Sequence, residues 1–451
     1  EIIGAAERHN KPGEFTAFMG WEWSSIPAGA NLHRIVFTPD GADIARRFLP
    51  YGSDQSEYPE DLWQWLEDTQ AGTGARFIAM PHNSNVSKGF MYDRKTLKQQ
   101  PINADYASRR LRWEPVSEIT QIKGDSETHP ALSPEDEFAD FETFAHNLQG
   151  EYEEYRATRA DYMRSALKTG LILEQDTGVN PYRFGVIGST DSHTGLASYE
   201  EGNFWGKFAR DSIPSQKRVD DLLGGSGSND WSMSASGLAA VWATDNTREE
   251  IFAAFQRREV YATSGTRLKV RLFAGWDFGE QDLHSAGFAA AGYGGGVPRG
   301  GVLTRDGQST GSAPRLMIRA EKEPVGANLD RIQVIKGWLD ASGEERERVF
   351  DVAWSGDREA GVDGKLAAVG NTVDLETGSY DNSIGAAELS ALWIDPEFDP
   401  AQSAFSDVRV MEIPTPRHSM LDGISLQTEA PGEGPATIQE RAYTSAVWYE
   451  P

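Results

Sequence analysis

The sequence predicts an α/β domain at residues 1–267 and a β-rich, sandwich-like domain at residues 268–451. In the first part, short apolar runs alternate with helical patterns, which is typical of βα units around a mostly parallel sheet. From about residue 268, strand-like runs follow one another between turns rich in Gly, Pro and Asp, which is an all-β pattern. The length of 451 residues is sufficient for two or three domains.

The strands expected in the first domain are short apolar runs, at residues 15–23, 34–38, 76–80, 117–122 and 184–189. The helices expected there have apolar residues at helical spacing, at residues 1–10, 59–71, 104–112, 136–148, 152–168 and 246–258. Thr247 is the expected N-cap of the last helix, and Glu249 and Glu250 lie in its first turn. Residues 200–236 are rich in Gly, Ser, Asp and Lys, and we expect a surface insertion there.

The second domain is expected to be β-rich, with six strand-like runs. They fall at residues 268–273, 315–319, 331–336, 349–353, 389–393 and 408–413. The glycine-rich run at residues 292–301 lacks the strand-then-helix context of a phosphate-binding loop, so we assign it no such function.

The composition excludes several kinds of chemistry. The chain has no cysteine, which excludes disulfides, thiolate nucleophiles and Cys-ligated metal sites. Its 43 basic and 69 acidic residues give a net charge of −26, which disfavours binding to nucleic acid or anionic lipid. No apolar run has the length of a membrane span. The sequence begins at Glu1, inside a helical pattern, and we expect that residues upstream are missing.

Metal-ligating side chains follow several predicted strands. Glu22 ends the run 15–23, His82 follows the run 76–80, and Asp191 and His193 follow the run 184–189. In α/β barrels the loops at the carboxyl ends of the strands form the active site. Carboxylate and imidazole ligands suit zinc, manganese or iron, and such an ion lowers the pKa of bound water. The pattern therefore predicts a metal-dependent hydrolase.

Further residues lie close to these motifs. His33 is a ligand, a general acid or a substrate contact, or else a structural histidine at a strand entry. His129, after the run 117–122, is either a ligand or structural. Arg34 and Lys123 are candidates for holding an anionic substrate, or for ordinary salt bridges. The carboxylate-rich stretch 125–137 is either a solvated face, which we take as the default, or a cation-binding loop.

Motifs along the whole chain resemble the bacterial family called domain of unknown function 3604. They read GWEW, NLHR, IAMPHNSN, EITQIKGDSETHP, GSTDSHTG, YATSGTR, GWDF, LDRIQVIKGW and IQERAYTSAVWY. Arg299, in GVPRGG, departs from that family's pattern, in which methionine is expected. The family in turn is similar to the polymerase and histidinol phosphatase (PHP) superfamily, many of whose members are phosphoesterases.

The resemblance implies a distorted PHP-like (β/α) barrel with two or three divalent metal ions, zinc, manganese or iron. It implies a bridging carboxylate at Glu22 and ligands at His82, Asp191 and His193, with His129 or His33 as a further ligand. PHP-like proteins also carry an early His-x-His motif and an Asp-His motif upstream of the Gly-x-Glu strand, and this sequence has neither. We therefore expect an N-terminally incomplete barrel, whose missing segment is a separate fragment or precedes Glu1, in a bacterial protein that is periplasmic or secreted.

The leading hypothesis is a phosphoesterase that attacks a small anionic ester with metal-activated water, with His33, Arg34 and Lys123 as catalytic or substrate-holding residues. One alternative is hydrolysis of another bond, such as an amide, a lactone or a sulfate ester. Another is a secreted or periplasmic binding protein for a carbohydrate or another ligand, with a degenerate barrel. Its stacking platforms would be tryptophans, namely Trp21, Trp23, Trp276 and Trp338. Chelation separates these classes, because a binding protein would keep its ligand affinity.

Overall fold

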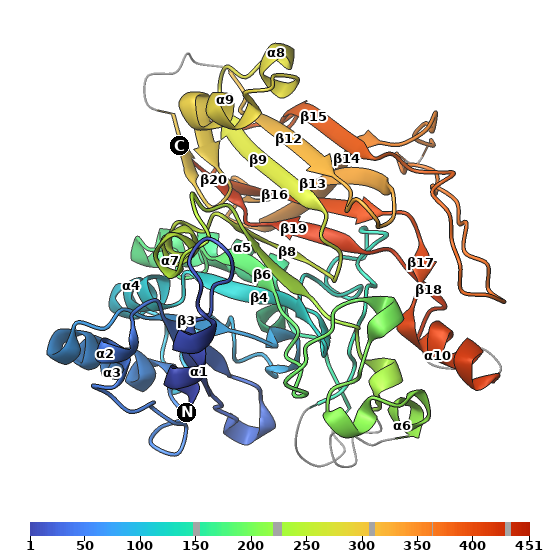
Figure 1. Ribbon diagram of the computed structural model, residues 1–451. Coiled ribbons are helices and arrows are strands. Elements are labelled where there is room, and N and C mark those ends of the chain that lie inside the picture. The colour runs from blue at the N-terminus through green and yellow to red at the C-terminus, as the bar shows by residue number, and fades with distance from the viewer. Residues whose placement is uncertain (148–153, 220–227, 306–311, 363, 429–433) are drawn as a thin grey trace.

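The computed structural model describes residues 1–147, 154–219, 228–305, 312–362, 364–428 and 434–451. It is a mixed α/β structure that is rich in sheet (Figure 1). The first 190 residues form a lower α/β region in Figure 1, and most of the chain after residue 260 forms a sheet-rich region above it.

The lower region contains two three-stranded sheets. The first has the order β1 (Met19–Trp23), β2 (Arg34–Thr38), β3 (Ile78–Pro81), and the second has the order β5 (Gly124–Asp125), β4 (Val116–Gln121), β6 (Gly185–Gly188). β3 lies beside β4, so the two sheets adjoin. No closed barrel is formed by the strand pairs of the described residues.

The expectation of a mostly parallel sheet is wrong for the first three strands. β1 and β2 pair antiparallel, as do β2 and β3, and only β4 and β6 pair in parallel. The connection between β1 and β2 consists of residues 24–33, which is shorter than the dozen or more residues that a parallel crossover needs. The strand positions themselves agree with the predicted runs.

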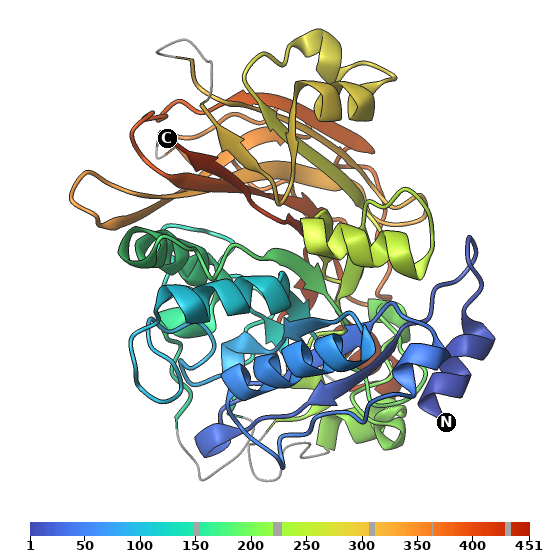
Figure 2. The ribbon, with the colours of Figure 1, turned by 90° about the vertical axis from the view of Figure 1, so that its left-hand side faces the viewer.

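Helices cover one side of the lower region. They are α1 (Ile2–His9), α2 (Ala42–Ala45), α3 (Pro59–Thr73), α4 (Ala104–Trp113), α5 (Met163–Thr177) and α7 (Arg248–Arg257). In Figure 2, α3, α4, α5 and α7 (blue to yellow-green) lie in front of the strands. The Thr247 side chain accepts a hydrogen bond from the Glu250 backbone N–H, which confirms the predicted N-cap of α7.

Two predicted helices differ from the structure. Residues 136–147 form turns and extended chain, because Asp136 points inward to pair with Arg164 and Arg409, and Phe144 is buried. Residue 148 lies outside the described residues. The helix expected at 152–168 begins only at Met163, after a 3-10 turn at Arg159–Asp161, and residues 152–153 are not described.

The sheet-rich region contains a large sheet and a small sheet. The large sheet has eight strands: β7 (Leu238–Val241), β8 (Val260–Thr263), β11 (Val302–Thr304), β13 (Leu329–Leu339), β14 (Glu345–Trp354), β16 (Ala404–Glu412), β19 (Arg441–Thr444) and β20 (Val447–Glu450). The small sheet has the order β10 (Gly296–Pro298), β9 (Lys269–Gly275), β12 (Arg315–Glu321), β15 (Glu388–Ile394). All six strands predicted after residue 267 are confirmed.

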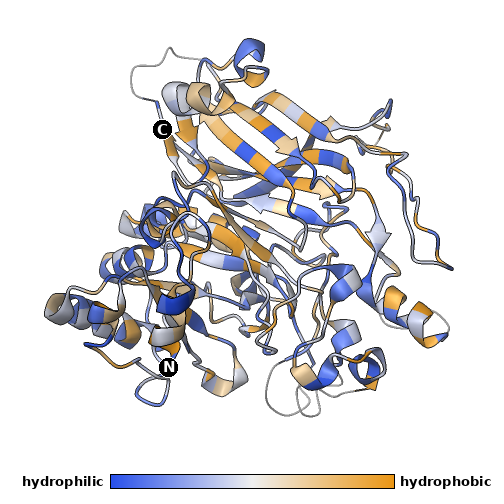
Figure 3. Ribbon diagram, viewed as in Figure 1, coloured by the Kyte–Doolittle hydropathy of each residue, from blue (hydrophilic) through white to orange (hydrophobic). Residues whose placement is uncertain are grey.

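A shared apolar core joins these two sheets. Leu272 and Ile318 from the small sheet and Val334 and Val410 from the large sheet belong to it. In Figure 3 the strands carry much of the orange, apolar sequence, interrupted by blue residues. β8 is hydrogen-bonded to β19 and also lies beside β6 of the lower region. The large sheet therefore contains sequence from both sides of the predicted boundary at residue 268, and that boundary stays a prediction.

The remaining elements are short. They are α6 (Pro214–Val219), α8 (Glu280–Leu283), α9 (Phe288–Gly295), α10 (His418–Leu426), β17 (Thr415–Pro416) and β18 (Thr437–Ile438). The expected insertion at 200–236 consists of α6, 3-10 turns and irregular chain, and residues 220–227 are not described. None of the described helices combines the length and apolarity that crossing a membrane requires.

We predict that Arg299→Met stabilises the protein. Arg299 follows β10, is buried beside Tyr261, and donates to the Val270 carbonyl oxygen, while its Nη1 has no hydrogen-bond partner. Burial lowers its pKa to about 10, which shows that this environment disfavours the charge. Methionine of similar length removes the buried cation, and we expect a gain of about 1–3 kcal/mol in the free energy of unfolding by urea titration. Arg299→Lys, which keeps a cation, should give no gain, and a clear loss of stability in Arg299→Met would contradict the prediction.

Candidate metal centre

One end of the β1-β2-β3 sheet brings together three side chains of types that can bind a metal ion. Glu22 lies near the carboxyl end of β1, His33 immediately precedes β2, and His82 immediately follows β3. The register pairs Trp23 with Arg34 and Arg34 with Pro81, so these three chain positions meet at the same edge. An antiparallel pair places the end of one strand beside the start of the next, which is why a histidine at a strand entry belongs to the cluster.

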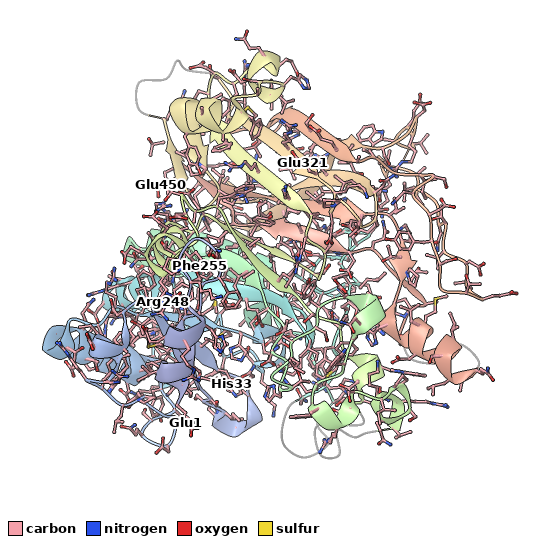
Figure 4. All side chains as sticks on the ribbon, viewed as in Figure 1. Glu1, His33, Arg248, Phe255, Glu321 and Glu450 are labelled. Atoms are coloured by element: carbon pink, nitrogen blue, oxygen red, sulfur yellow. The ribbon has the colours of Figure 1, made fainter. Side chains whose placement is uncertain are left out.

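The three side chains offer ligand atoms that all lie within 4.8 Å of one another. His33 Nδ1 lies 2.8 Å from Glu22 Oε1, and the His33 and His82 ring centroids are 5.4 Å apart. The Ser24 hydroxyl donates to Glu22 Oε1 at 2.6 Å. Figure 4 labels His33 in the lower α/β region, well away from Glu321 of the sheet-rich region.

Two imidazole nitrogens in this cluster are buried and have no hydrogen-bond partner among the residues that the structure describes. They are His33 Nε2 and His82 Nδ1. Leaving a buried polar atom unpaired costs on the order of 1–3 kcal/mol, so such atoms call for a partner that the protein itself does not provide. Both atoms belong to residues of the three-ligand cluster.

The protonation states in the cluster favour metal binding. Burial lowers the pKa of His82 to about 4, so its imidazole is neutral at pH 7 and keeps a free lone pair. Burial opposes ionisation of Glu22, but the hydrogen bonds from His33 and Ser24 and the nearby His82 outweigh it and lower its pKa to about 2. A neutral imidazole and an ionised carboxylate are the forms that bind divalent ions.

Asp191 and Lys123 lie close enough to the cluster for their charges to act on the pKa of His82. Asp191 follows β6 and adopts a left-handed backbone conformation with φ +48. Its carboxylate oxygen Oδ2 is bound by Lys123 Nζ and, at 2.7 Å, by Lys207 Nζ. Burial opposes ionisation of Asp191, but the two lysines outweigh it and hold its pKa well below the usual range.

Glu118 on β4 is a buried carboxyl group beside Asp191. The Ser189 hydroxyl donates to its Oε2, and the Asn83 backbone N–H donates to its Oε1 at 3.3 Å. Burial, together with the Asp191 charge, raises its pKa to about 8, so it holds a proton at neutral pH. Glu118 thus connects the chain after β3 with the chain after β6.

The family model described as "Protein of unknown function (DUF3604)" matches residues 1–451. The chain belongs to this family. A comparison with curated proteins found none that matches the chain. In this DUF3604 protein, the motifs GWEW, NLHR and IAMPHNSN supply Glu22, His33 and His82, respectively.

Two other predicted ligands of the DUF3604 chain, His193 and His129, are not members of the three-ligand cluster. His193 is exposed; its Nδ1 contacts the Asp191 carbonyl oxygen, and its ring packs on Phe208. His129 is half-buried against Tyr155 and Tyr162. The structure therefore brings together the ligand atoms of Glu22, His33 and His82, with Asp191 and Lys123 nearby, whereas His193 contacts the backbone of Asp191 and His129 packs against two tyrosines.

Arg34 forms a buried ion pair with Glu114. It is buried, and its Nε donates to Glu114 Oε1 at 2.9 Å. The Trp63 indole N–H donates to the same carboxylate oxygen at 3.0 Å. These contacts correspond to the salt-bridge interpretation of Arg34, and they stabilise the packing of β2 on α3 and α4.

Sequence reasoning missed two residues beside the cluster in this DUF3604 chain. Glu118 lies inside the predicted strand 117–122, as the first residue of the motif EITQ. An acidic residue within a buried strand is rare, so this position could have indicated a functional carboxyl group. Lys207 lies in the predicted insertion 200–236, where no local pattern marks it. Only the tertiary contact with Asp191 identifies it.

Proposed function

We propose that this protein is a metal-dependent hydrolase that acts on phosphate esters, with a divalent ion held by Glu22, His33 and His82. The observation that carries the proposal is the cluster itself, in which three ligand atoms lie within 4.8 Å and two buried imidazole nitrogens lack partners. Two imidazoles and one carboxylate form a donor set that leaves coordination positions for water and substrate. The set suits zinc, manganese or iron.

A likeness to PHP hydrolases, with a second or third ion, belongs to the same proposal. The adjoining sheets β1-β2-β3 and β5-β4-β6 support it, because β3 lies beside β4 and the charges of Asp191, after β6, and Lys123, after β4, act on His82, after β3. A further ion would require Asp191 to exchange at least one of its lysine contacts for the metal.

When bound, the ion would lower the pKa of a water molecule and polarise the ester oxygen. The protein's own groups have separate tasks. Ser24 and His33 fix the orientation of Glu22 through hydrogen bonds. Glu118 stores a proton beside Asp191 at neutral pH, which suits it to donate a proton during turnover. Lys123 supplies positive charge next to His82 for an anionic substrate.

Metal removal is the direct test of the proposed function. We expect the purified protein to contain at least one zinc, manganese or iron ion per chain by mass spectrometry, and to hydrolyse an aryl phosphate ester. A chelator should remove the ion and reduce the hydrolysis rate by at least about 100-fold, and reconstitution should restore both. Hydrolysis that survives complete metal loss would contradict the proposal.

The same experiment addresses the two alternatives. A carbohydrate-binding protein would keep its ligand affinity after chelation. Of its expected stacking residues, Trp23 is fully buried. Trp276 packs against Phe398 and Tyr449, and Trp21 packs against Phe48, Trp65 and Phe77, so these two rings have aromatic neighbours inside the protein. Hydrolysis of an amide, a lactone or a sulfate ester instead of a phosphate ester would appear in a substrate panel as metal-dependent activity without phosphate release.

A further inference from the structure

A cavity of about 320 Å³ is lined by the end of β16, by β17 and α10 at the right of Figure 1, and by the chain from Tyr199 to Gly202. Among the described residues that line it, five are glutamates and none is a lysine, an arginine or a histidine. The glutamates are Glu200, Glu201, Glu323, Glu412 and Glu440. The volume is at the lower end of the range typical of ligand pockets. The cavity is therefore acidic and large enough for a small molecule.

Two of these glutamates lie side by side on neighbouring chains. Glu412 is the last residue of β16, Glu440 directly precedes β19, and the Glu412 backbone N–H donates to the Glu440 carbonyl oxygen at 2.8 Å. The two residues are only 2% and 7% exposed. Like charges opposite each other on paired chains are destabilising, so the fold keeps these two carboxyl groups together at a cost.

Each of the two carboxyl groups has one hydroxyl donor and, among the described contacts, no cationic partner. The Thr266 hydroxyl donates to Glu412 Oε1 at 2.5 Å, and the Ser264 hydroxyl donates to Glu440 Oε2. Lys322, whose charge acts on Glu412, donates from its Nζ to a backbone carbonyl oxygen at 2.6 Å instead. The second oxygen of each carboxyl group, Glu412 Oε2 and Glu440 Oε1, accepts no hydrogen bond from the described residues.

Glu201 adds a third carboxyl group to the cavity. Its Oε2 accepts a hydrogen bond from the His418 backbone N–H, and its Oε1 is buried without a hydrogen-bond partner. The cation that acts most strongly on it, Arg417, forms a bidentate pair with Glu142. The described residues therefore supply no paired cation to any of these three carboxyl groups.

This arrangement differs from the way in which the protein treats other buried carboxylates, such as Glu114, which pairs with Arg34. Burial raises the pKa of Glu412 to about 8 and that of Glu201 to about 7. Burial, together with the charges of its glutamate neighbours, raises the pKa of Glu440 well above its usual value. Burying a carboxylate without a partner is costly, so a cation that enters the cavity would relieve this cost and displace protons.

The spacing of the carboxyl groups favours an organic cation over a metal ion. In the described part of the chain, the group of Glu22, His33 and His82 is the one set of three or more metal-ligating side chains with ligand atoms within 4.8 Å. The glutamates of the cavity therefore do not converge on a single ion. Tyr199 and Tyr380 also line the cavity, and aromatic rings attract cations.

We propose that this cavity binds a small organic diamine in its diammonium form, with Glu201, Glu412 and Glu440 as the acceptors of its N–H groups. Two ammonium groups match a site with more than one unpaired carboxylate, and each would form charge-assisted hydrogen bonds there. The inference goes beyond the proposed hydrolase and does not depend on it, because none of the ligands of the candidate metal centre lines the cavity.

The test titrates the protein as purified with 1,4-diaminobutane by calorimetry at pH 8.5, in the wild type, Glu412→Gln and Asp407→Asn. Glutamine keeps the size of the side chain and an acceptor for Thr266 but removes the charge. Asp407 is the matched control, because it is a carboxyl group on the same strand whose pKa burial raises to about 7, and it does not line the cavity. We expect Glu412→Gln to weaken binding by about 10- to 100-fold, the size of one or two charged hydrogen bonds, and Asp407→Asn by less than about 2-fold.

Two ligand controls and a pH series accompany this titration. We expect no binding of 1,4-butanediol, which has the same length without charge, and binding of butylamine at least about 10-fold weaker than that of the diamine. Wild-type affinity should rise at least about 10-fold from pH 6 to pH 7, because the ionised fraction of Glu412 grows with pH below its pKa of about 8. The other ionisable groups that face Glu412 are Glu323, Glu440, Tyr380 and Lys322.

Equally tight diamine binding in Glu412→Gln and the wild type, with both folded by circular dichroism, would overturn the inference. Butanediol that binds as tightly as the diamine, or a wild type that binds no diamine, would also overturn it. Calcium binding that is lost in Glu412→Gln, without diamine binding in the wild type, would replace the diamine by a metal ion. If Glu412→Gln does not fold, Glu440→Gln takes its place, because it removes a charge from the neighbouring chain and keeps an acceptor for Ser264.

Discussion

His82→Ala is expected to lower the affinity for zinc or manganese by at least about 100-fold and to abolish metal-dependent hydrolysis. His82 is one of three ligands in the cluster, it is buried, and its imidazole is neutral at pH 7. Loss of a residue that merely supports a ligand already costs 10- to 100-fold in affinity, so loss of a ligand should cost at least as much. Competition with a metal-sensitive dye would measure the change.

Two further variants make this prediction specific. Glu22→Gln keeps the size of the side chain and an oxygen acceptor for Ser24 but removes the charge, and it should also weaken metal binding strongly. His129→Ala removes a histidine that lies away from the cluster, against Tyr155 and Tyr162, and should change metal affinity by less than about 2-fold. Equal losses in His82→Ala and His129→Ala would contradict the three-ligand centre and favour the ligand set that family resemblance implies.

Arg409→Met is expected to lower the free energy of unfolding by about 3–5 kcal/mol, and among the substitutions proposed for this protein we expect it to cost the most stability. Arg409 on β16 is fully buried and binds Glu127 at 3.0 Å, Asp136 at 2.8 Å and the Gln333 side-chain oxygen at 2.7 Å. Arg164 on α5 binds the same two carboxylates. Without Arg409, two buried carboxylates would share one guanidinium, and the remaining negative charge would be uncompensated.

Urea unfolding measures this loss, with Arg346→Met as the control. Arg346 on β14 is 54% exposed and pairs with Asp340 at the surface, so its removal should cost less than about 1 kcal/mol. Because Glu127 and Asp136 belong to the lower region and Arg409 to the large sheet, we also expect Arg409→Met to separate the unfolding of the two regions into two transitions. A single transition with a loss below about 1 kcal/mol would show that the network does not hold them together.

The buried ion pairs of Arg164 and Arg409 with Glu127 and Asp136 correct one interpretation of the sequence. The carboxylate-rich stretch 125–137 has the appearance of a solvated face, but Asp125, Glu127 and Asp136 are buried. Asp125 accepts a hydrogen bond from the Tyr443 hydroxyl at 2.6 Å, and Glu127 and Asp136 bind Arg164 and Arg409. Charged residues are rarely buried unless they are paired, and the partners here are separated by up to 318 positions in the sequence. No local pattern could have indicated the pairing.

The sequence by itself determined the chemistry that is available and most of the local structure. The lack of cysteine restricts a metal site to imidazole and carboxylate ligands. Glu22 and His82 were predicted as ligands because they lie at the end of one apolar run and just after another. The helices at α3, α4 and α7 and the strands of the sheet-rich region were predictable because their periodicity and capping residues act over only a few positions.

Only the tertiary structure decided which of these side chains meet. The antiparallel order of β1, β2 and β3 brings His33 into the cluster, whereas the turn after β6 leaves His193 exposed. Lys207 reaches Asp191 from a segment without regular pattern. Strand direction and the burial of charge depend on partners that are distant in the chain, so their energies are fixed by the complete fold rather than by neighbouring residues.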